Sequence, residues 1–275
     1  MGGAGARRAR GVVPGLSKPK SVIAADYDLS GARFSEFADR LVYSHLAAPL
    51  AERVRACGTP ALDVASGTGA LGRRLDDVVA MDISHGQLVN NPLALRVQAD
   101  AECLPFVDGV FAAAASAFGI NHFPDPVTAV REMARVARTV ALMTWVRPEE
   151  HPYPPKVAVL EVIEKHAGRA KTKAGELVER MSEETGSESA LARVFDSAGL
   201  TVETETISVE VPWPGAEAFV DYRFSMASVL AHVEDVDRVR TEAVAAVRGL
   251  SESEVSWRPR LVLAVGTRPQ QAAGG

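Results

Sequence analysis

The chain has 275 residues, of which 47% are hydrophobic, enough to bury one large core or two small ones. Its formal net charge of −5 at pH 7 argues against a nucleic-acid partner. No stretch approaches the ~18 consecutive apolar residues of a membrane-spanning helix, so we expect no membrane partner. The two cysteines, Cys57 and Cys103, predict free thiols in a reducing cytoplasm.

Residues 1–20 differ in composition from the rest of the chain. They carry five basic residues, no acidic residue, and several Gly and Pro, which predicts a disordered basic tail. The pair Arg7-Arg8 is found in export signals, but no apolar stretch follows it here. Residues 21–275 are predicted to form the folded domain.

Apolar segments of strand length alternate with amphipathic helical segments through the folded part. This pattern predicts an α/β protein with a mostly parallel sheet and helices on both faces. The expected helices cover 34–57, 126–137 and 189–198, with Asp125 as a cap and Gly199 as a terminator. The first expected strand begins at residue 61 and ends in the acidic Asp63, and the others cover 78–84, 95–99, 111–117, 139–146, 201–211 and 260–267.

A glycine-rich loop follows the first of these strands. Gly67, Gly69 and Gly72 fit the pattern Gly-x-Gly-x-x-Gly, and glycines let a backbone approach a ligand closely. A helix is expected to open near Ala70 and to direct its N-terminal N–H groups at the loop. The arrangement favours a nucleotide-like ligand, although glycines at such a turn also serve the turn alone.

Three carboxylates near strand ends narrow the choice of ligand. Asp63 precedes the loop, Asp82 ends the second strand and Asp100 follows the third. Asp82 can accept both ribose hydroxyls, and Asp100 can accept from an adenine amino group. A carboxylate beside the loop repels a pyrophosphate and attracts a cation. The set favours a positively charged nucleoside over a nicotinamide dinucleotide.

Four motifs in this order resemble class I S-adenosylmethionine-dependent methyltransferases, in particular the small-molecule group that includes the ubiquinone/menaquinone-type enzymes. The resemblance covers roughly residues 40–147 and implies a Rossmann-like sheet of seven mostly parallel strands, closed by an antiparallel hairpin. The motifs are Leu62-Asp63-Val64-Ala65-Ser66-Gly67-Thr68-Gly69, Met81-Asp82-Ile83-Ser84, Gln98-Ala99-Asp100-Ala101-Glu102-Cys103-Leu104-Pro105-Phe106 and Ser116-Ala117-Phe118-Gly119-Ile120-Asn121-His122-Phe123-Pro124-Asp125-Pro126.

The resemblance implies S-adenosylmethionine as cofactor, S-adenosylhomocysteine as product, and a set of binding residues. Asp63 and the glycine loop hold the methionine part, Asp82 the ribose, and the segment after the third strand the adenine. The implied cofactor residues are Asp63, Ala65, Ser66, Gly67, Thr68, Gly69, Asp82, Ile83, Gln87, Asp100, Ala101, Glu102, Ala117 and Phe118.

This chain departs from the family pattern at three positions. Ala65 stands where the family often has Gly, and Ala112 follows Phe111 where Asp is usual. Gln87 stands where a Met commonly packs on the adenine. Ala65 and Ala112 give slight support to a second hypothesis, a non-catalytic binding module whose site has degenerated.

Two segments exceed a minimal fold of this type, at about 148–186 and 212–250. In the family such insertions form helical lids over the substrate; otherwise they are surface helices packed on the core. Candidate substrate-binding residues on them are His151, Tyr153, Tyr222 and His232.

Methyl transfer needs a general base only when the acceptor must lose a proton. His122, just after the fourth strand, is the first candidate because histidine exchanges protons near neutral pH. Tyr27 is the second, since an aromatic N-terminal residue often covers the cofactor in related enzymes. Each residue can equally serve packing alone.

The sequence therefore predicts an enzyme that methylates an O or N atom of a small specialised metabolite, such as a natural-product or antibiotic intermediate. The alternatives are a protein of this fold that catalyses a cyclisation or rearrangement without methylation, and an NAD(P)-dependent oxidoreductase. No metal site is expected, because no His pairs with a second ligand at suitable spacing. A homodimer is compatible with the sequence.

Overall fold

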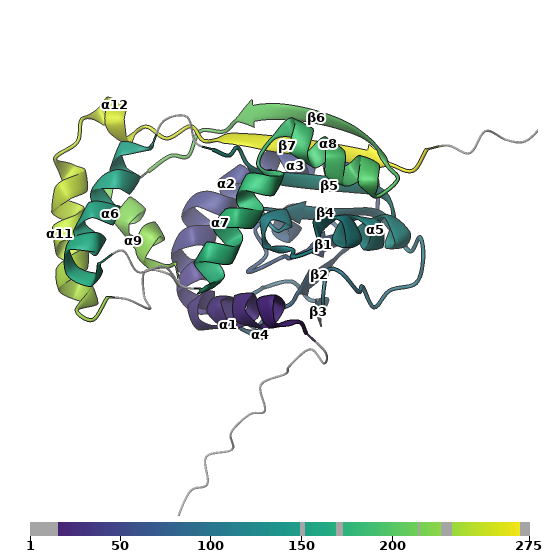
Figure 1. The fold of residues 1–275 in the computed structure, drawn as a ribbon, viewed down its shortest axis with the longest axis horizontal. Coiled ribbons are helices and arrows are strands. Elements are labelled where there is room, and N and C mark those ends of the chain that lie inside the picture. The colour runs from purple at the N-terminus through teal and green to yellow at the C-terminus, as the bar shows by residue number, and fades with distance from the viewer. Residues whose placement is uncertain (1–15, 149–151, 169–172, 214, 227–232, 270–275) are drawn as a thin grey trace, which may run out of the picture.

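The computed structural model describes residues 16–148, 152–168, 173–213, 215–226 and 233–269. Seven strands form one sheet in the order β3-β2-β1-β4-β5-β7-β6 (Figure 1). All neighbouring pairs are parallel except those of β7, which is antiparallel to β5 and β6. The strands are β1 (Ala61–Val64), β2 (Val78–Asp82), β3 (Arg96–Gln98), β4 (Phe111–Ala117), β5 (Ala137–Trp145), β6 (Thr201–Ser208) and β7 (Arg260–Thr267).

The predicted fold class and the closing hairpin are confirmed. β1 and β4 lie at the centre of the sheet and are apolar along almost their whole length, because helices cover both of their faces. Successive residues of β4 point to opposite faces, so Ala113 and Ala115 belong to one core and Ala114 to the other.

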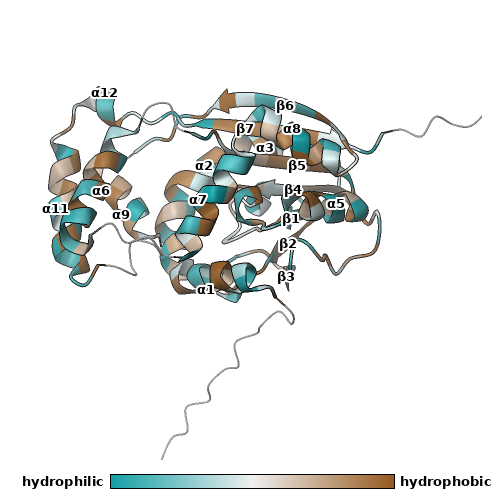
Figure 2. Ribbon diagram, viewed as in Figure 1, coloured by the Kyte–Doolittle hydropathy of each residue, from teal (hydrophilic) through white to brown (hydrophobic). Residues whose placement is uncertain are grey.

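Helices supply the other half of each core (Figure 2). On one face, α3 (Ala48–Ala56) buries Leu50 and Val54. On the other face, α5 (Pro126–Val136) and α8 (Glu188–Ser197) bury apolar residues of the second core. The predicted helix-end residues of α5 and α8 are confirmed. The Asp125 carboxylate caps α5 by accepting from the backbone N–H of Thr128 at 2.9 Å, and Gly199 ends α8 with a φ of 82°.

The N-terminal segment corrects the expected boundary of the tail. Residues 1–15 lie outside the described part, but α1 (Lys18–Arg33) begins within the segment predicted to be disordered. It continues through a π-helical stretch, η1 (Phe34–Tyr43), and the short α2 (Ser44–Leu46) into α3. The helical prediction for 34–57 was right in kind and too short at its start.

The helix expected to open near Ala70 is not formed. One 3₁₀ turn, η2 (Gly72–Arg74), follows the glycine loop, and the chain then turns into β2. The segment between β1 and β2 is too short for both the loop and a full helix. A helix dipole therefore does not act on this loop, and the argument that depended on it was wrong.

The two predicted insertions are helical. The first contains α6 (Pro154–Ala167) and α7 (Lys173–Thr185), and the second contains α9 (Ala216–Phe224) and α11 (Val236–Arg248), with the short α12 (Glu252–Val255) just after its predicted end. Helices α6, α9 and α11 pack together beside the sheet domain, at the left of Figure 1. Helix α7 instead lies against α1 and the 3₁₀ turn η3 (Ile120–His122).

In the described part of the chain, every helix is too short or too polar to cross a bilayer.

Candidate active site

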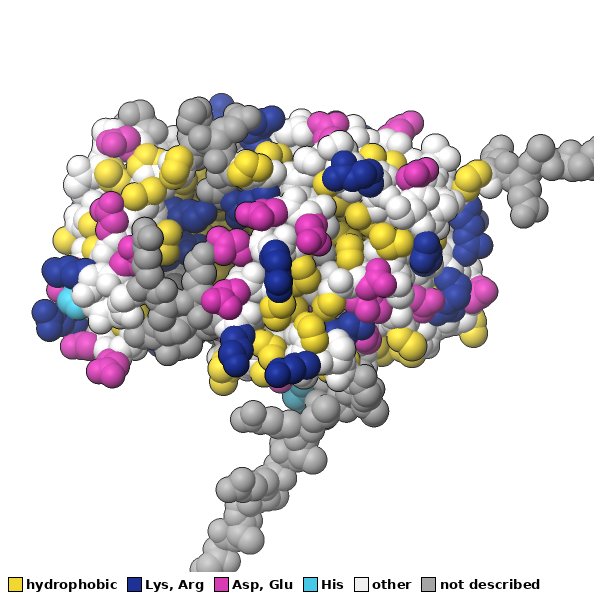
Figure 3. Space-filling model, viewed as in Figure 1, with side chains coloured by type: hydrophobic (Ala, Val, Ile, Leu, Met, Phe, Trp, Pro, Cys, Tyr) yellow, Lys and Arg dark blue, Asp and Glu magenta, His cyan; other side chains and the backbone are white. Residues whose placement is uncertain are grey.

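A cavity of about 1480 Å³ extends from the carboxyl ends of the central strands to helices α6, α7 and α9. Figure 3 shows basic and apolar side chains in a hollow between these helices and the sheet domain. Most of the residues predicted from sequence line the cavity: Tyr27, Ala65, Ser66, Gly67, Thr68, Asp82, Ile83, Gln87, Asp100, Ala101, Glu102, Ala117, Phe118, His122, Tyr153 and Tyr222.

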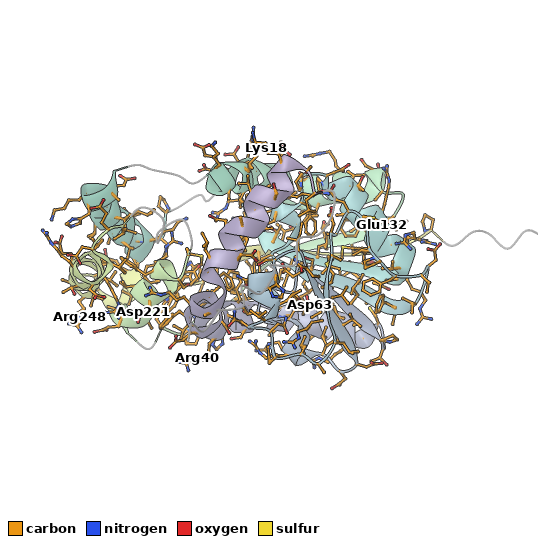
Figure 4. The ribbon with its side chains drawn as sticks, turned by 90° about the horizontal axis from the view of Figure 1, so that it is seen from below. Lys18, Arg40, Asp63, Glu132, Asp221 and Arg248 are labelled. Atoms are coloured by element: carbon orange, nitrogen blue, oxygen red, sulfur yellow. The ribbon has the colours of Figure 1, made fainter. Side chains whose placement is uncertain are left out.

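Two predicted residues do not line it. Asp63 is buried beneath the loop, near the centre of the molecule in Figure 4, and its carboxylate accepts the backbone N–H of Gly72 at 2.9 Å. Burial raises the pKa of Asp63 to about 8, which disfavours the charged form that was expected to attract a cation. Gly69 also lies outside the lining. His151 and His232 fall outside the described residues.

The glycine loop is held in an unusual backbone shape. Gly67 and Gly69 have φ of 52° and 94°, and Ala65 has φ of 55°, a conformation that L-residues with a Cβ rarely adopt. The Asn91 side-chain amide donates to the Gly67 carbonyl at 3.0 Å and fixes the far side of the loop. A Cβ at Gly69 would lie 3.0 Å from the Asn91 side chain, so this position requires a glycine.

A buried ion pair, which the sequence gave no signal for, supports the same loop. Asp39, from η1, accepts the Thr68 hydroxyl at 2.7 Å and pairs with Arg73 at 2.7 Å. Arg73 also donates to the Thr68 carbonyl at 2.9 Å. The two partners are far apart in sequence, and only the fold brings them together.

The Asp82 carboxylate reaches the loop from the end of β2. Its oxygens accept the backbone N–H groups of Gly67 and Ser84, both at 2.8 Å. Burial raises the pKa of Asp82 to about 6, while these two N–H groups counteract the rise. The carboxylate is therefore charged at neutral pH and keeps free lone pairs on the cavity side for ribose hydroxyls.

Lys20 of α1 occupies the region expected to receive adenine. Its ammonium lies 2.6 Å from the Asp100 carboxylate and 2.6 Å from that of Glu102. Sequence analysis assigned Lys20 to the tail and missed this contact. The cation neutralises part of the acidic charge that was expected to face an adenine amino group.

The polar lining has one buried acceptor left without a partner. Gln87 donates from its side-chain amide to the Tyr27 carbonyl at 3.1 Å, and its Oε1 has no hydrogen-bond partner in the described part of the protein. A buried unpaired oxygen beside a glycine loop and a strand-end carboxylate fits a ligand with hydrogen-bond donors, as a ribosyl or amino-acid group has.

The two candidate catalytic residues, 95 positions apart in sequence, are in contact. The Tyr27 hydroxyl lies 2.7 Å from Nε2 of His122, and the other ring nitrogen lies 3.0 Å from the Phe118 carbonyl. Because a carbonyl can only accept, Nδ1 carries the proton and Nε2 accepts from Tyr27. Burial lowers the pKa of His122 to about 4, so the ring is neutral at physiological pH.

Aromatic rings surround the rest of the cavity. All four tyrosines of the chain line it. Trp257 stacks on Trp145 at a ring-centroid distance of 5.9 Å and on Tyr153 at 5.4 Å. Trp213 also stacks on Trp257, at a ring-centroid distance of 5.7 Å. The sequence analysis named Tyr153 and Tyr222 as substrate-binding candidates but named no tryptophan. Trp145 lies at the end of β5, and Trp213 and Trp257 lie in loops far from it in the sequence.

No group of three or more His, Cys, Asp or Glu side chains suited to a metal ion occurs among the described residues.

Part of the chain is similar to known methyltransferases. Residues 62–142 match the family model for a methyltransferase domain. A demethylmenaquinone methyltransferase of Mycobacterium marinum is 37% identical over 122 residues, which cover 42% of this chain and 52% of that protein. A ubiquinone/menaquinone biosynthesis C-methyltransferase of Hahella chejuensis is 33% identical over 98 residues, 30% of this chain and 39% of that protein.

A solved structure gives the wider fold. The phosphoethanolamine N-methyltransferase 2 of Haemonchus contortus, bound to phosphomonomethylethanolamine and S-adenosylhomocysteine, aligns with a TM-score of 0.54 at 12% identity, covering 94% of this chain and 61% of that one. At that identity the likeness is one of fold. The sequence matches, in contrast, cover about half or less of each relative, and the residues that the family model matches run from β1 into β5. Residues 62–142 thus match a methyltransferase domain, and part of the chain is similar in sequence to methyltransferases of quinone biosynthesis.

Proposed function

We propose that the protein transfers a methyl group from S-adenosylmethionine to a small acceptor bound beside Tyr27 and His122. The observation that carries the proposal is the continuity of the cavity, which joins the glycine loop and Asp82 to the Tyr27–His122 pair. Its volume of about 1480 Å³ exceeds the upper end, ~1,000 Å³, of a typical single-ligand pocket, so a cofactor and an acceptor fit together.

Several residues of the chain suit the cofactor. Ser66, Gly67 and Thr68 would border its amino-acid part, Asp82 would accept the ribose hydroxyls, and Ile83 would pack on the adenine. When bound, S-adenosylmethionine supplies a methyl group already activated by a sulfonium. The protein has then to orient the acceptor, exclude water and manage the acceptor's proton.

The Tyr27–His122 pair can accept that proton. Tyr27 donates to Nε2 of His122, so its oxygen lone pairs remain available to an acceptor hydroxyl. As the acceptor O–H bond breaks, its proton passes to the Tyr27 oxygen and the Tyr27 proton passes to Nε2. Burial raises the pKa of Tyr27, which keeps the phenol protonated and able to relay in this way.

The site of methylation is the finer part of the proposal. From the sequence we expected an O or N atom, whereas the similar proteins include one named as a C-methyltransferase of quinone biosynthesis. Removal of a proton from an aromatic hydroxyl raises the electron density on the neighbouring ring carbon as well as on oxygen. We therefore favour a ring carbon of a hydroxylated acceptor: once the methyl group bonds to that carbon, the carbon's own proton leaves to solvent as the ring becomes aromatic again, and the relay returns its proton to the hydroxyl.

Calorimetric titration tests the cofactor. We expect micromolar binding of S-adenosylmethionine and S-adenosylhomocysteine, no binding of reduced nicotinamide cofactor, and a large loss of affinity in Asp82→Asn. Asparagine has nearly the same side-chain volume as aspartate. The thermal midpoint of unfolding of Asp82→Asn shows whether the variant is folded. Binding of the nicotinamide cofactor instead of the adenosyl ligands would support an oxidoreductase.

Isotope transfer tests the chemistry. With S-adenosylmethionine labelled in its methyl group and a panel of hydroxylated aromatic acceptors, labelled product is expected, and His122→Gln should lower kcat by ~10²–10⁴-fold. Affinity for S-adenosylhomocysteine should stay within about threefold. His166→Gln is the control, because His166 pairs with Glu242 away from the cavity. Equal rates in the two variants would exclude His122 as the proton acceptor.

A further inference from the structure

The acceptor side of the cavity contains an arginine without an acidic partner. Arg223, near the end of α9, lines the cavity and makes no ion pair with any carboxylate that the structure describes. Its Nε atom is buried without a hydrogen-bond partner. A half-buried guanidinium with an unused buried donor is costly unless a ligand completes its hydrogen bonds.

Two tyrosine hydroxyls accompany this arginine. The guanidinium carbon of Arg223 lies 5.8 Å from the centre of the Tyr222 ring. The hydroxyls of Tyr43 and Tyr222 interact with each other, and the positive charge of Arg223 acts on both. One cation and two phenols therefore converge at one end of the cavity, a donor set that suits an anion.

Two other basic side chains that line the cavity are paired within the protein, whereas Arg147, also in the lining, acts with Arg223 on Tyr222. Arg258, at the rim, pairs with Glu210 at 2.7 Å, and Lys20 is held by Asp100 and Glu102. Their charges are already neutralised within the protein. Arg223 also lies over the Tyr222 ring, and the cavity-lining glutamates Glu164, Glu179 and Glu183 come from α6 and α7.

The ring packing defines the other part of the ligand. Trp145 and Trp257 stack at 5.9 Å, and both rings line the cavity together with Tyr43 and Tyr222. Flat aromatic walls favour a flat aromatic ligand, since offset stacking adds to the burial of apolar surface. A short aliphatic acceptor would leave much of this surface in contact with water.

We propose that the acceptor is an aromatic acid whose ring packs against Trp145 and Trp257 and whose anionic group binds Arg223 beside Tyr43 and Tyr222. This inference rests on the proposed methyl transfer and adds the acceptor's charge and shape. It distinguishes this chain from proteins acting on neutral quinone nuclei. Arg223 would determine specificity by binding the acceptor, and Tyr27 and His122 would remain at the reacting hydroxyl.

A matched pair of probes separates charge from ring stacking. The affinities of 1-hydroxy-2-naphthoate and the neutral 1-hydroxy-2-naphthamide are measured by quenching of tryptophan fluorescence, in the presence of saturating S-adenosylhomocysteine. We expect the wild-type protein to bind the acid at least tenfold more tightly than the amide. In Arg223→Gln this preference should fall to within threefold, through weaker binding of the acid only.

Three further variants complete the test. Arg258→Gln, which removes a cavity-rim arginine already paired with Glu210, should keep the preference for the acid. Arg223→Lys, which keeps the positive charge but loses the planar guanidinium, should keep part of the preference for the acid. Trp145→Leu should weaken both probes alike. Bound S-adenosylhomocysteine and an unchanged thermal midpoint show that each variant is folded.

The outcomes distinguish this inference from the function on which it rests. If S-adenosylhomocysteine does not bind, the methyltransferase proposal fails. If it binds and the wild-type protein shows equal affinity for acid and amide, or Arg223→Gln keeps the preference, the acceptor is not an anion held by Arg223 and the inference is overturned.

Discussion

Ala65 shows how a single residue determines the shape of the cofactor loop. With a φ of 55° it adopts the left-handed conformation that glycine adopts without strain. Family members often have glycine here, and the structure explains why the alanine matters: its Cβ costs free energy in this conformation, but the surrounding hydrogen bonds still enforce it.

Replacement of Ala65 by glycine should therefore stabilise the protein. Relief of the left-handed strain, ~1–2 kcal/mol, outweighs the greater chain entropy of glycine in the unfolded state, and a net gain of about 0.5–1 kcal/mol in the free energy of unfolding is expected. Urea unfolding measures it. Ala245→Gly, at an exposed position of α11, is the control and should destabilise by ~1 kcal/mol. Destabilisation by both variants would show that Ala65 is unstrained.

As the proposed acceptor for the ribose hydroxyls, Asp82 should make cofactor binding sensitive to pH. Burial raises its pKa to about 6, so the carboxylate is charged at pH 7 and becomes protonated as the pH falls through 6. A protonated Asp82 loses acceptor capacity for ribose hydroxyls. The affinity for S-adenosylhomocysteine should thus fall by roughly tenfold per unit below pH 6, as calorimetry at several pH values would show.

The same titration in Asp82→Asn provides the control. This variant should bind weakly at pH 7 and show little further loss between pH 7 and 5, because the titrating group has been removed. A wild-type affinity that is constant over this range would mean that the carboxylate does not contact the ligand.

At the scale of elements, α1 covers the cofactor region and is attached to it by Lys20. The ammonium bridges Asp100 and Glu102, with side chains that are 12%, 16% and 14% exposed, so the contacts are largely shielded from water. The sequence analysis placed Lys20 in the tail and expected helix only from residue 34. Composition suggested a solvated tail, whereas the two acidic partners, 80 or more positions away in sequence, favour an ordered helix.

Substitution of Lys20 by methionine should loosen α1. Loss of the cation leaves two shielded carboxylates close together, and we expect destabilisation of about 1–3 kcal/mol together with faster hydrogen exchange of α1 amides. Lys18→Met, at an exposed position near the start of the same helix, should change neither quantity. Equal exchange in the two variants would show that other contacts hold α1 in place.

The strands illustrate what the pattern of an element can predict. The alternation of apolar segments gave all seven strands, and the bounds of β4 and β7 were correct to the residue. The helix after the glycine loop was wrong, because the loop itself and the return to β2 take up the chain between β1 and β2. The glycine pattern predicted a helix directly after the loop, and the short spacing here permits only one 3₁₀ turn.

On the scale of the whole molecule, the cavity connects the sheet domain to the helices α6, α9 and α11. Its lining comes from many elements, from Lys20 in α1 to Arg260 in β7. Figure 4 shows Asp221 and Arg248 in these helices, far from Asp63 in the sheet domain. We propose that the helices act as a lid, since a ligand between them and the sheet would contact both.

Ligand binding should therefore stabilise the molecule as a unit. At a concentration of S-adenosylhomocysteine 100 times its Kd, linkage gives about 2.7 kcal/mol, which corresponds to a rise in thermal midpoint of roughly 5–10 °C for a chain of this size. Scanning calorimetry measures it, and Asp82→Asn at the same concentration should show a much smaller rise. A second transition that the ligand leaves unchanged would mean that the helices unfold independently of the cofactor site.

The sequence by itself determined the sheet, the order of the strand-end motifs and most of the residues that line the cofactor side. These depend on local periodicity and on short motifs, whose geometry is set within a few residues of chain. Tertiary structure alone decided that Tyr27 contacts His122, that Lys20 reaches Asp100, that Asp63 is buried away from the cavity, and that Arg223 lies among aromatic rings. Such contacts join residues distant in the chain, and burial, which sets their charge, depends on everything packed around them.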